Sequence, residues 1–288
     1  MKVLTLFVLI FIVPFNTLAA NNKDENEIPR LEKMEVDQYS HYHIDPLFID
    51  ETKLNQLLNS LKERTYIAPE NAFINEGGEI IDGKQGMILD EMEFHRTFRD
   101  VYYSNDGGEV LQVPVKGTYP KVDRALLEDI RSNKLGSYST FFKKSNTERS
   151  HNISLATNAI NNYVVFPGET FSFNEVVGER TKEKGYKQAP VIVKGELSED
   201  IGGGICQVSS TLFNAVDLEG IKIVERYAHS KEVPYVPPGK DAAVSWWGPD
   251  FVFKNIYNQP LLILASAKDG SLIIDIYSSD TVDYFTGN

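Results

Sequence analysis

The residue best placed to do covalent chemistry in this sequence is Cys206, the single cysteine among 288 residues. Three glycines, at 202–204, precede it with only Ile205 between, and the apolar residues after it predict a helix that stops near Gly220. Cys206 should therefore lie at or just before a helix start, where unpaired N–H groups and the helix dipole stabilise an anion. This position suits a thiolate nucleophile. A small buried thiol that only packs fits the same spacing equally well.

A nucleophilic cysteine needs a nearby base, and histidine performs this role best near neutral pH. Among the five histidines, His229 is the first candidate because it follows an apolar strand expected at 221–224, directly after the cysteine helix. His151 is the reserve candidate. The second ring nitrogen of His229 needs an acceptor, for which Asp241, Ser230 or a backbone carbonyl could serve.

Other chemistry is less well supported by the residue types. The glycine-rich turn lacks the Gly-Lys-Ser/Thr element of a phosphate-binding loop, so we do not expect a bound nucleotide. A single cysteine excludes an internal disulfide and a zinc site built from several thiolates, and we expect no metal and no cofactor. The hydroxyl groups that follow the cysteine should pack or bond to the backbone inside the helix rather than attack a substrate: Ser209, Ser210 and Thr211.

Composition limits the class of protein. The chain is 42% hydrophobic and 24% charged, which is typical of one or two globular domains. The balance of 29 Lys and Arg against 41 Asp and Glu gives a net charge of -12, so no overall basic field exists to hold nucleic acid.

The first 20 residues predict a secretory signal peptide. A lysine precedes an apolar run at 3–15, which is shorter than the ~20 residues needed to cross a bilayer, and small residues near Ala19 offer a cleavage site. We expect a secreted protein with no membrane span after cleavage. Residues 21–49 are polar and are expected to form a flexible linker, in which His41 and His43 are solvated rather than metal-bound.

The elements that must position the chemistry fall into two expected domains. Residues 50–135 predict a small α+β domain, with one helix marked by four leucines at helical spacing and a hairpin around 73–81. Residues 136–288 predict a mostly antiparallel β domain with a few helices and a terminal hairpin at 261–276. The fold class is therefore expected to be α+β.

The second domain carries a dense series of motifs: RSHNI at 149–153, FPGETFSFN at 166–174, VGERT at 177–181, APVI at 189–192, GGGICQVSST at 202–211, HS at 229–230 and YVPPGKDA at 235–242. With these motifs, the segment from about Gly136 to Ser278 resembles the VanW domain family. The preceding segment, 50–135, is similar to the peptidoglycan-binding domain that often comes before a VanW domain.

The resemblance implies a function, because some VanW-domain proteins are L,D-transpeptidases that use the motif cysteine. Cys206 would attack the amide before the terminal D-Ala of a peptidoglycan stem peptide, and His229 would act as base and acid. The amides of Gly204, Ile205 and Gln207 would form the oxyanion hole. The candidate substrate-binding residues are Arg180 and Arg226, for a stem carboxylate, with Asp241 and Trp246.

Two other functions remain open at this stage. A carboxypeptidase would form the same acyl-enzyme and let water resolve it. A non-catalytic peptidoglycan-binding accessory protein, linked to the response to glycopeptide antibiotics, would use Cys206 only for packing. In each case the expected location is outside the cell or in the cell wall, in a Gram-positive bacterium.

Overall fold

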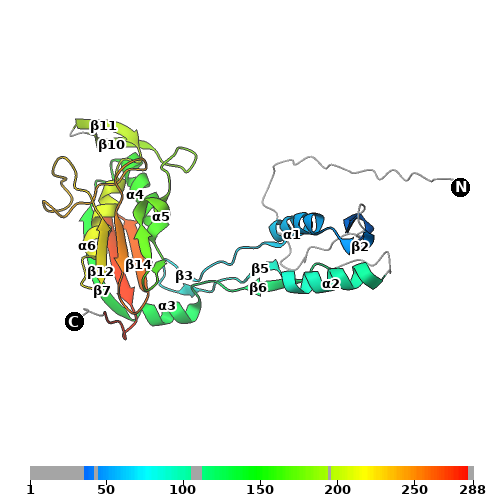
Figure 1. The fold of residues 1–288 in the computed structure, drawn as a ribbon. Coiled ribbons are helices and arrows are strands. Elements are labelled where there is room, and N and C mark those ends of the chain that lie inside the picture. Colours follow the sequence, from blue (N-terminus) through cyan, green and yellow to red (C-terminus); the bar gives the residue numbers. More distant parts are fainter. Residues whose placement is uncertain (1–35, 42–44, 105–111, 194–195, 285–288) are drawn as a thin grey trace. The chain divides into compact units, whose positions relative to one another are not determined.

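The computed structural model of the chain describes residues 36–41, 45–104, 112–193 and 196–284 (Figure 1). The segment expected to be a signal peptide lies outside these residues. Two compact units are present: unit 1 is Met1–Ile67 with Met87–Lys116, and unit 2 is Ala68–Gly86 with Gly117–Asn288. Within the described parts no helix is long and apolar enough to cross a membrane.

Unit 1 is built around two helices, α1 (Glu51–Thr65) and α2 (Glu91–Ser104). The side chain of Asp50 caps α1 by accepting the backbone N–H groups of Thr52 and Lys53. The predicted leucine face of α1 is confirmed, because its side chains are buried in one core with two phenylalanines of α2: Leu54, Leu58, Leu61, Phe94 and Phe98. Two short strands, β5 (Gly86–Leu89) and β6 (Val115–Thr118), also pair with each other.

The structure differs from the sequence prediction in the segment before α1. Within the range expected to be a flexible linker, residues 36–41 and 45–49 form a 3-10 helix, η1 (Val36–Tyr39), and two paired strands, β1 (Ser40–His41) and β2 (Asp45–Ile49). The ring of Tyr39 packs edge-on against Phe98 at a centroid distance of 5.4 Å. A few apolar residues placed against an existing core are therefore enough to order this polar segment.

Unit 2 contains a four-stranded antiparallel sheet in the order β7-β15-β14-β8, and these strands have the following bounds: β7 Asn133–Phe141, β15 Ser271–Ser278, β14 Leu261–Lys268 and β8 Tyr163–Val165. Two helices, α4 (Thr147–Ile160) and α6 (Ile205–Ala215), pack against each other and against this sheet (Figure 1). The predicted terminal hairpin is confirmed as the pair β14–β15.

A second sheet and a hairpin complete the surroundings of the site. The sheet has the order β12-β13-β9, formed by Ile221–Glu225, Val252–Asn255 and Thr170–Ser172. The short helix α5 (Phe173–Val177) follows β9, and the strands β10 (Gln188–Val193) and β11 (Glu196–Ile201) form a hairpin that leads into α6. Helices and antiparallel sheets in one chain confirm the predicted α+β class.

The two compact units do not follow the domain boundary expected between residues 135 and 136. The predicted hairpin, β3 (Phe73–Ile74) with β4 (Ile80–Ile81), and the helix α3 (Arg124–Ile130) belong to unit 2. Their apolar side chains share a core with Val164 and Leu262 of the large sheet. Burial of this apolar surface explains why both segments join the sheet although unit 1 residues separate them in sequence.

Candidate active site

Cys206 lies in the first turn of α6, as predicted from the sequence. The N-cap of this helix is Gly204, whose φ of 109° is a conformation that side chains with a Cβ atom rarely adopt. The thiol is partly buried and donates to the backbone oxygen of Val244 at 3.4 Å. The helix start therefore presents the sulfur on a wall formed with the segment around Val244.

The glycines before Cys206 are needed because other parts of the chain approach them closely. A Cβ atom on Gly203 would lie 2.5 Å from the backbone oxygen of Ala189. The fully buried side chain of Asn152, on α4, donates to the backbone oxygens of Lys187 and Gly203 at 2.9 and 3.1 Å. Helix α4 and the start of β10 thus fix the turn that carries the cysteine.

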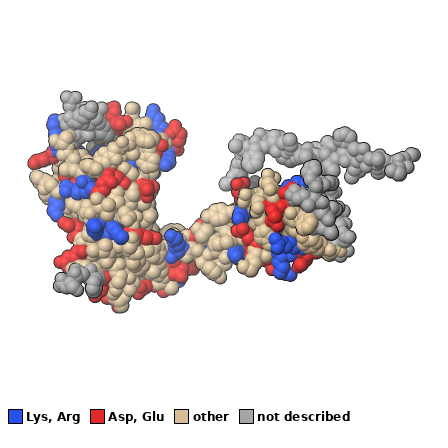
Figure 2. All heavy atoms as spheres, in the orientation of Figure 1, with Lys and Arg blue, Asp and Glu red and all other residues tan. Residues whose placement is uncertain are grey.

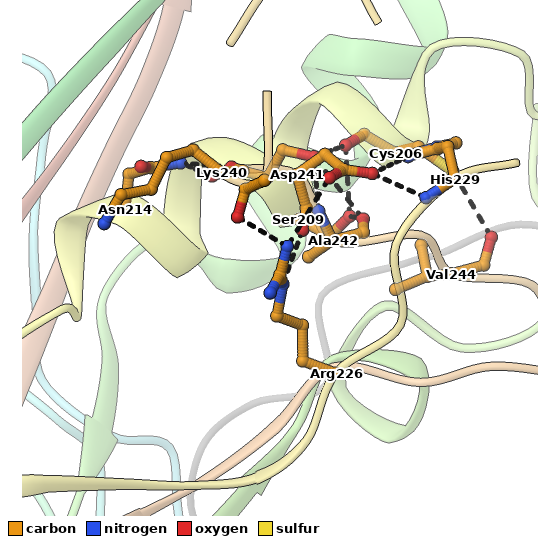
Figure 3. A network of polar contacts seen from close by, with 11 residues as sticks. Cys206, Ser209, Asn214, Arg226, His229, Lys240, Asp241, Ala242 and Val244 are labelled. Atoms are coloured by element: carbon orange, nitrogen blue, oxygen red, sulfur yellow. Dashed lines mark hydrogen bonds and ion pairs between the residues drawn. The ribbon is translucent and has the colours of Figure 1, made fainter. Parts of the chain in front are cut away.

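His229 and Asp241 form a close pair beside this turn (Figure 3). The Nδ1 atom of His229 lies 2.6 Å from Oδ2 of Asp241, and the same carboxylate oxygen accepts the backbone N–H of His229 at 2.6 Å. Both side chains are about nine-tenths buried, with 9% and 10% of their surface exposed. The Cys206 side chain lies close enough to the imidazole to influence the pKa of His229.

The electrostatics of the pair follow from these contacts. Burial opposes the charged form of His229, but the hydrogen bond and charge of Cys206, followed by those of Asp241, raise the pKa of His229 above its ordinary value. Burial also acts against the charged form of Asp241. The two hydrogen bonds and the charge of His229 outweigh it and lower the pKa of Asp241. Asp241 is therefore a carboxylate acceptor that favours a protonated, correctly oriented imidazole.

The segment that carries Asp241 is fastened to α6 by polar side chains of the helix. Ser209 donates to the backbone oxygen of Ala242 at 2.6 Å, and Ser210 accepts the backbone N–H of Ala242 at 2.9 Å. Asn214, one turn further on, donates to the backbone oxygen of Lys240 at 2.7 Å. The prediction that the hydroxyl groups after Cys206 bond to backbone rather than act as nucleophiles is consistent with these contacts.

Arg226 supports the same segment and does not line the cavity beside Cys206, which corrects its expected role as a substrate-binding residue. Its Nε donates to the backbone oxygen of Asp241 at 2.6 Å, and its Nη2 donates to that of Gly239 at 2.7 Å. The guanidinium also lies 4.5 Å from the ring centroid of Phe213. Arg226 is committed to holding Asp241 in place. Asp241 in turn orients His229 and is not itself a wall residue of the cavity.

A cavity of about 930 Å³ opens in front of Cys206 and His229. Trp246 lines it as expected, and so do the neighbouring Trp247 and the end of β7 at Phe141. Trp247 and Phe141 are 89% and 73% exposed, so large aromatic faces stand at the cavity wall without being covered. A volume of this size accommodates an extended peptide segment or a sugar next to the thiol.

Two arginines line this cavity, Arg180 as predicted and Arg149, which the sequence analysis did not single out. Arg180 donates from Nη2 to Oδ1 of Asn174 at 2.8 Å, and Arg149 donates from Nη2 to Oε1 of Gln207 at 2.8 Å. Burial lowers the pKa of both guanidinium groups, and electrostatic interactions, chiefly with Tyr235 for Arg149 and with Tyr186 for Arg180, partly oppose this effect. The motif at 149–153 was the signal that could have identified Arg149.

Some backbone N–H groups at the start of α6 are hydrogen-bonded within the protein, and others are available to a ligand. Ile205 donates to the oxygen of Gly202 at 3.2 Å, and Gln207 donates to that of Gly204 at 3.0 Å. These two N–H groups, expected in an oxyanion hole, are therefore already bonded. Across the described residues, the N–H groups of Gly204 and Cys206 have no acceptor. Among the expected donors, the N–H of Gly204 is therefore available to a substrate oxygen, as is the N–H of Cys206 itself.

The remaining candidates lie away from the thiol. The ring of His151, the reserve base, bonds to the backbone oxygen of Gly185 at 2.9 Å and does not line the cavity. Among residues that the structure describes, no cluster of three or more His, Cys, Asp or Glu side chains could hold a metal ion.

Tyr235 also lines the cavity, where burial and the charge of Cys206 raise the pKa of its phenol and keep it protonated.

Comparison with known proteins places these motifs in a family. The family model described as "VanW like protein" matches residues 148–277. The chain is 54% identical over 235 residues to the uncharacterized protein YoaR of Bacillus subtilis (strain 168), which covers 82% of this chain and 77% of that protein. It is 30% identical over 132 residues to the Vancomycin B-type resistance protein VanW of Enterococcus faecalis (strain ATCC 700802 / V583), covering 44% of this chain and 48% of that protein. No solved structure matches the chain. The chain therefore belongs to the VanW family.

Proposed function

We propose that this protein is an exported cell-wall enzyme, an L,D-transpeptidase that cross-links peptidoglycan stem peptides through a thioester on Cys206. The observation that carries the proposal is the arrangement of Cys206, His229 and Asp241 on the wall of a peptide-sized cavity. A thiol, a base and an acceptor that orients the base form the minimal set for nucleophilic acyl transfer.

The first half-reaction forms the acyl-enzyme. His229 accepts the Cys206 proton, and the sulfur attacks the carbonyl carbon of the amide between the diamino acid and the terminal D-Ala. The carbonyl oxygen becomes an oxyanion near the free N–H groups of Gly204 and Cys206. The C–N bond then breaks, and the D-Ala nitrogen takes the proton from His229. D-Ala leaves and a thioester remains.

The second half-reaction joins two stems. The side-chain amine of a neighbouring stem attacks the thioester carbonyl, His229 accepts the amine proton, and the C–S bond breaks. The sulfur leaves as a thiolate and recovers its proton from His229. The product is an amide cross-link, and the enzyme returns to its starting state. If water took the place of the amine, the same steps would give a carboxypeptidase.

The rest of the chain fits a role at the cell wall. The signal-peptide-like start would export the protein in a Gram-positive bacterium, and unit 1 would bind peptidoglycan. The large net negative charge of -12 argues against nucleic acid as a partner. Acidic and basic side chains are interspersed on the face drawn in Figure 2, with no continuous basic patch on that face.

A second function is favoured by one observation: the Cys206 side chain contacts the main core of unit 2. In that case the protein is a peptidoglycan-binding accessory protein without catalysis, linked to the glycopeptide-antibiotic response that the name of the Enterococcus faecalis relative describes. Such a protein needs Cys206 only for packing.

The decisive experiment incubates residues 21–288 with disaccharide-tetrapeptide muropeptides and follows the intact-protein mass and the product masses. A transpeptidase gains the mass of the acyl group, releases D-Ala and produces a cross-linked dimer. Release of D-Ala without a dimer would identify the carboxypeptidase. The Cys206→Ser variant should lose acylation while its melting temperature stays unchanged. Absence of any acyl adduct on the unmodified protein would favour the accessory protein.

A further inference from the structure

The glycine turn before Cys206 holds the stems of two arginine side chains. A Cβ atom on Gly204 would lie 2.9 Å from Cγ of Arg149, and a Cβ atom on Gly202 would lie 3.2 Å from Cγ of Arg180. Both contacts are closer than side chains normally tolerate, so glycine at these two positions makes room for the arginines. The turn therefore brings two guanidinium groups to the residue that carries the thiol.

Neither guanidinium is in direct contact with a carboxylate of the described residues. In the part of the chain that the structure describes, Arg149 and Arg180 form no ion pair, although Glu179 and Asp200 line the same cavity. Each arginine has a single hydrogen-bond acceptor, and that acceptor is an uncharged amide oxygen, from Gln207 and Asn174 respectively. Charged groups are seldom buried without a partner of opposite charge, because removing them from water is costly.

Each arginine also has donors left over. Nη1 of Arg180 is buried without any hydrogen-bond partner within the described residues. Three further nitrogens, Nε of Arg180 and Nε and Nη1 of Arg149, are not buried and form no hydrogen bond with any residue that the structure describes. Packing of Arg180 over the ring of Phe173, at 5.8 Å from its centroid, and its bond to Asn174 hold the guanidinium in place. Preorganised and unsatisfied cationic donors at a cavity wall are typical of an anion-binding site.

We infer that Arg149 and Arg180 form a carboxylate subsite, which binds the free C-terminal carboxylate of the residue released by Cys206. This inference rests on the proposed function and specifies its donor. In a stem that ends one residue after the reactive amide, the terminal carboxylate is only a few covalent bonds from the attacked carbonyl. The subsite must therefore lie close to the sulfur, and both arginines line the same cavity as Cys206. Arg180 is the better anchor, because the ring of Phe173 and the bond to Asn174 together hold its guanidinium in place.

Binding tests the subsite without chemistry. The Cys206→Ser variant of residues 21–288 is titrated with a synthetic tetrapeptide stem ending in D-Ala, and with the same peptide carrying a C-terminal carboxamide. Charge-assisted hydrogen bonds should make the acid bind roughly 10- to 100-fold more tightly than the amide. Adding Arg180→Gln should remove most of this preference by weakening the acid alone, and Arg180→Lys should retain an intermediate preference. Equal affinity of the acid and the amide would overturn the subsite.

Acylation by the unmodified protein separates this inference from the proposed function. A transpeptidase with this subsite acylates with the acid at least tenfold faster than with the amide, whereas Arg180→Gln should acylate with both at similar rates, which also shows that the variant is folded. Arg131→Gln removes an arginine of unit 2 that does not line the cavity and should keep the preference. If the acid and the amide acylate the protein at equal rates, the carboxylate subsite is refuted and the proposed transpeptidase function still stands. Tight binding of the acid without acylation refutes the function and supports the subsite.

Discussion

The backbone N–H and the Nδ1 atom of His229 both bond to one carboxylate oxygen of Asp241, each at 2.6 Å. One oxygen therefore fixes both the position of the residue and the direction of its ring. Such a double contact holds the imidazole with its other nitrogen toward Cys206 before any substrate arrives.

Replacing Asp241 by Asn should reduce the acylation rate by roughly 10²- to 10⁴-fold, because an amide can hold the wrong ring tautomer and carries no charge to stabilise the imidazolium. The melting temperature should change little in comparison, since the side chain keeps its size. The rate is measured by intact-protein mass spectrometry. An acylation rate within a factor of two of that of the unmodified protein would refute the orienting role.

The pH dependence of acylation should reflect the raised pKa of His229. Neutral imidazole accepts the thiol proton, so the acidic limb of the rate should lie above about pH 6.5. Asp241→Asn removes one of the groups that raise this pKa and should move the limb to lower pH. NMR titration of the His229 ring provides an independent measurement. A limb unaffected by the substitution would show that another group controls the rate.

The same shift predicts how stability varies with pH. The pKa of His229 is higher in the folded protein than in the unfolded chain, so the stabilisation by its protonated form is complete below about pH 6.5 and is lost as pH rises through the folded-state pKa. Urea unfolding of the unmodified protein, measured from about pH 5 to about pH 9, should show that the free energy of unfolding falls as His229 loses its proton. The loss should be absent in His229→Gln, and its persistence there would assign it to another residue.

Arg226 should act as a positioning residue rather than a substrate contact. Arg226→Gln loosens the backbone of Asp241 and Gly239, which should lower kcat about tenfold while KM for the muropeptide stays near its original value. Arg226→Lys should restore part of kcat, because one charged donor remains. A rise in KM with kcat unchanged would instead show that Arg226 contacts the substrate.

Gly203 should be one of the positions in unit 2 that tolerates a methyl group least. Gly203→Ala places a Cβ atom 2.5 Å from the oxygen of Ala189 and 2.8 Å from that of Pro190, both of them backbone atoms. We expect a destabilisation of ~1–3 kcal/mol, measured by urea unfolding. The control is Gly77→Ala, whose nearest contact is a side-chain oxygen at 3.3 Å. Equal stability of the two variants would contradict the close packing of the turn.

Trp247 should contribute to substrate binding and not to stability. Its side chain is 89% exposed beside the cavity, so Trp247→Ala should leave the unfolding free energy within about 0.5 kcal/mol of its original value. Loss of the aromatic face should raise KM for a disaccharide-linked stem roughly threefold to tenfold. Tyr119→Ala, which removes an aromatic ring that is 76% exposed and does not line the cavity, should leave KM unchanged.

Local patterns predicted much of this structure. Helix α6 with Cys206 in its first turn, the leucine face of α1 and the hairpin β14–β15 all follow from residues close together in sequence. The sequence left several possible acceptors for the His229 ring, of which Asp241 was one. The choice of Asp241 depends on side chains of α6 that hold the segment around Ala242 in place. Spacing alone does not reveal such distant contacts.

The sequence predictions that differ from the structure also concern contacts between residues that are distant in sequence. Arg226 was expected at the substrate, since sequence does not show that its guanidinium is used by backbone oxygens at 239 and 241. The expected domain boundary at 135/136 overlooked how well the α3 segment and the β3–β4 hairpin cover the large sheet. Apolar burial decided both the placement of α3 and the ordering of residues 36–41 and 45–49, and neither leaves a periodic signal in the sequence.

The position of β15 determines when this protein can become complete during its synthesis. This strand, Ser271–Ser278, lies between β7 and β14 in the large sheet, and α6 packs on both β7 and β15. Until residues 271–278 have left the ribosome, β7 has no strand to pair with, and the cavity wall at Phe141 is not anchored. Cys206 and this wall of the cavity therefore come together only after β15 has been synthesised.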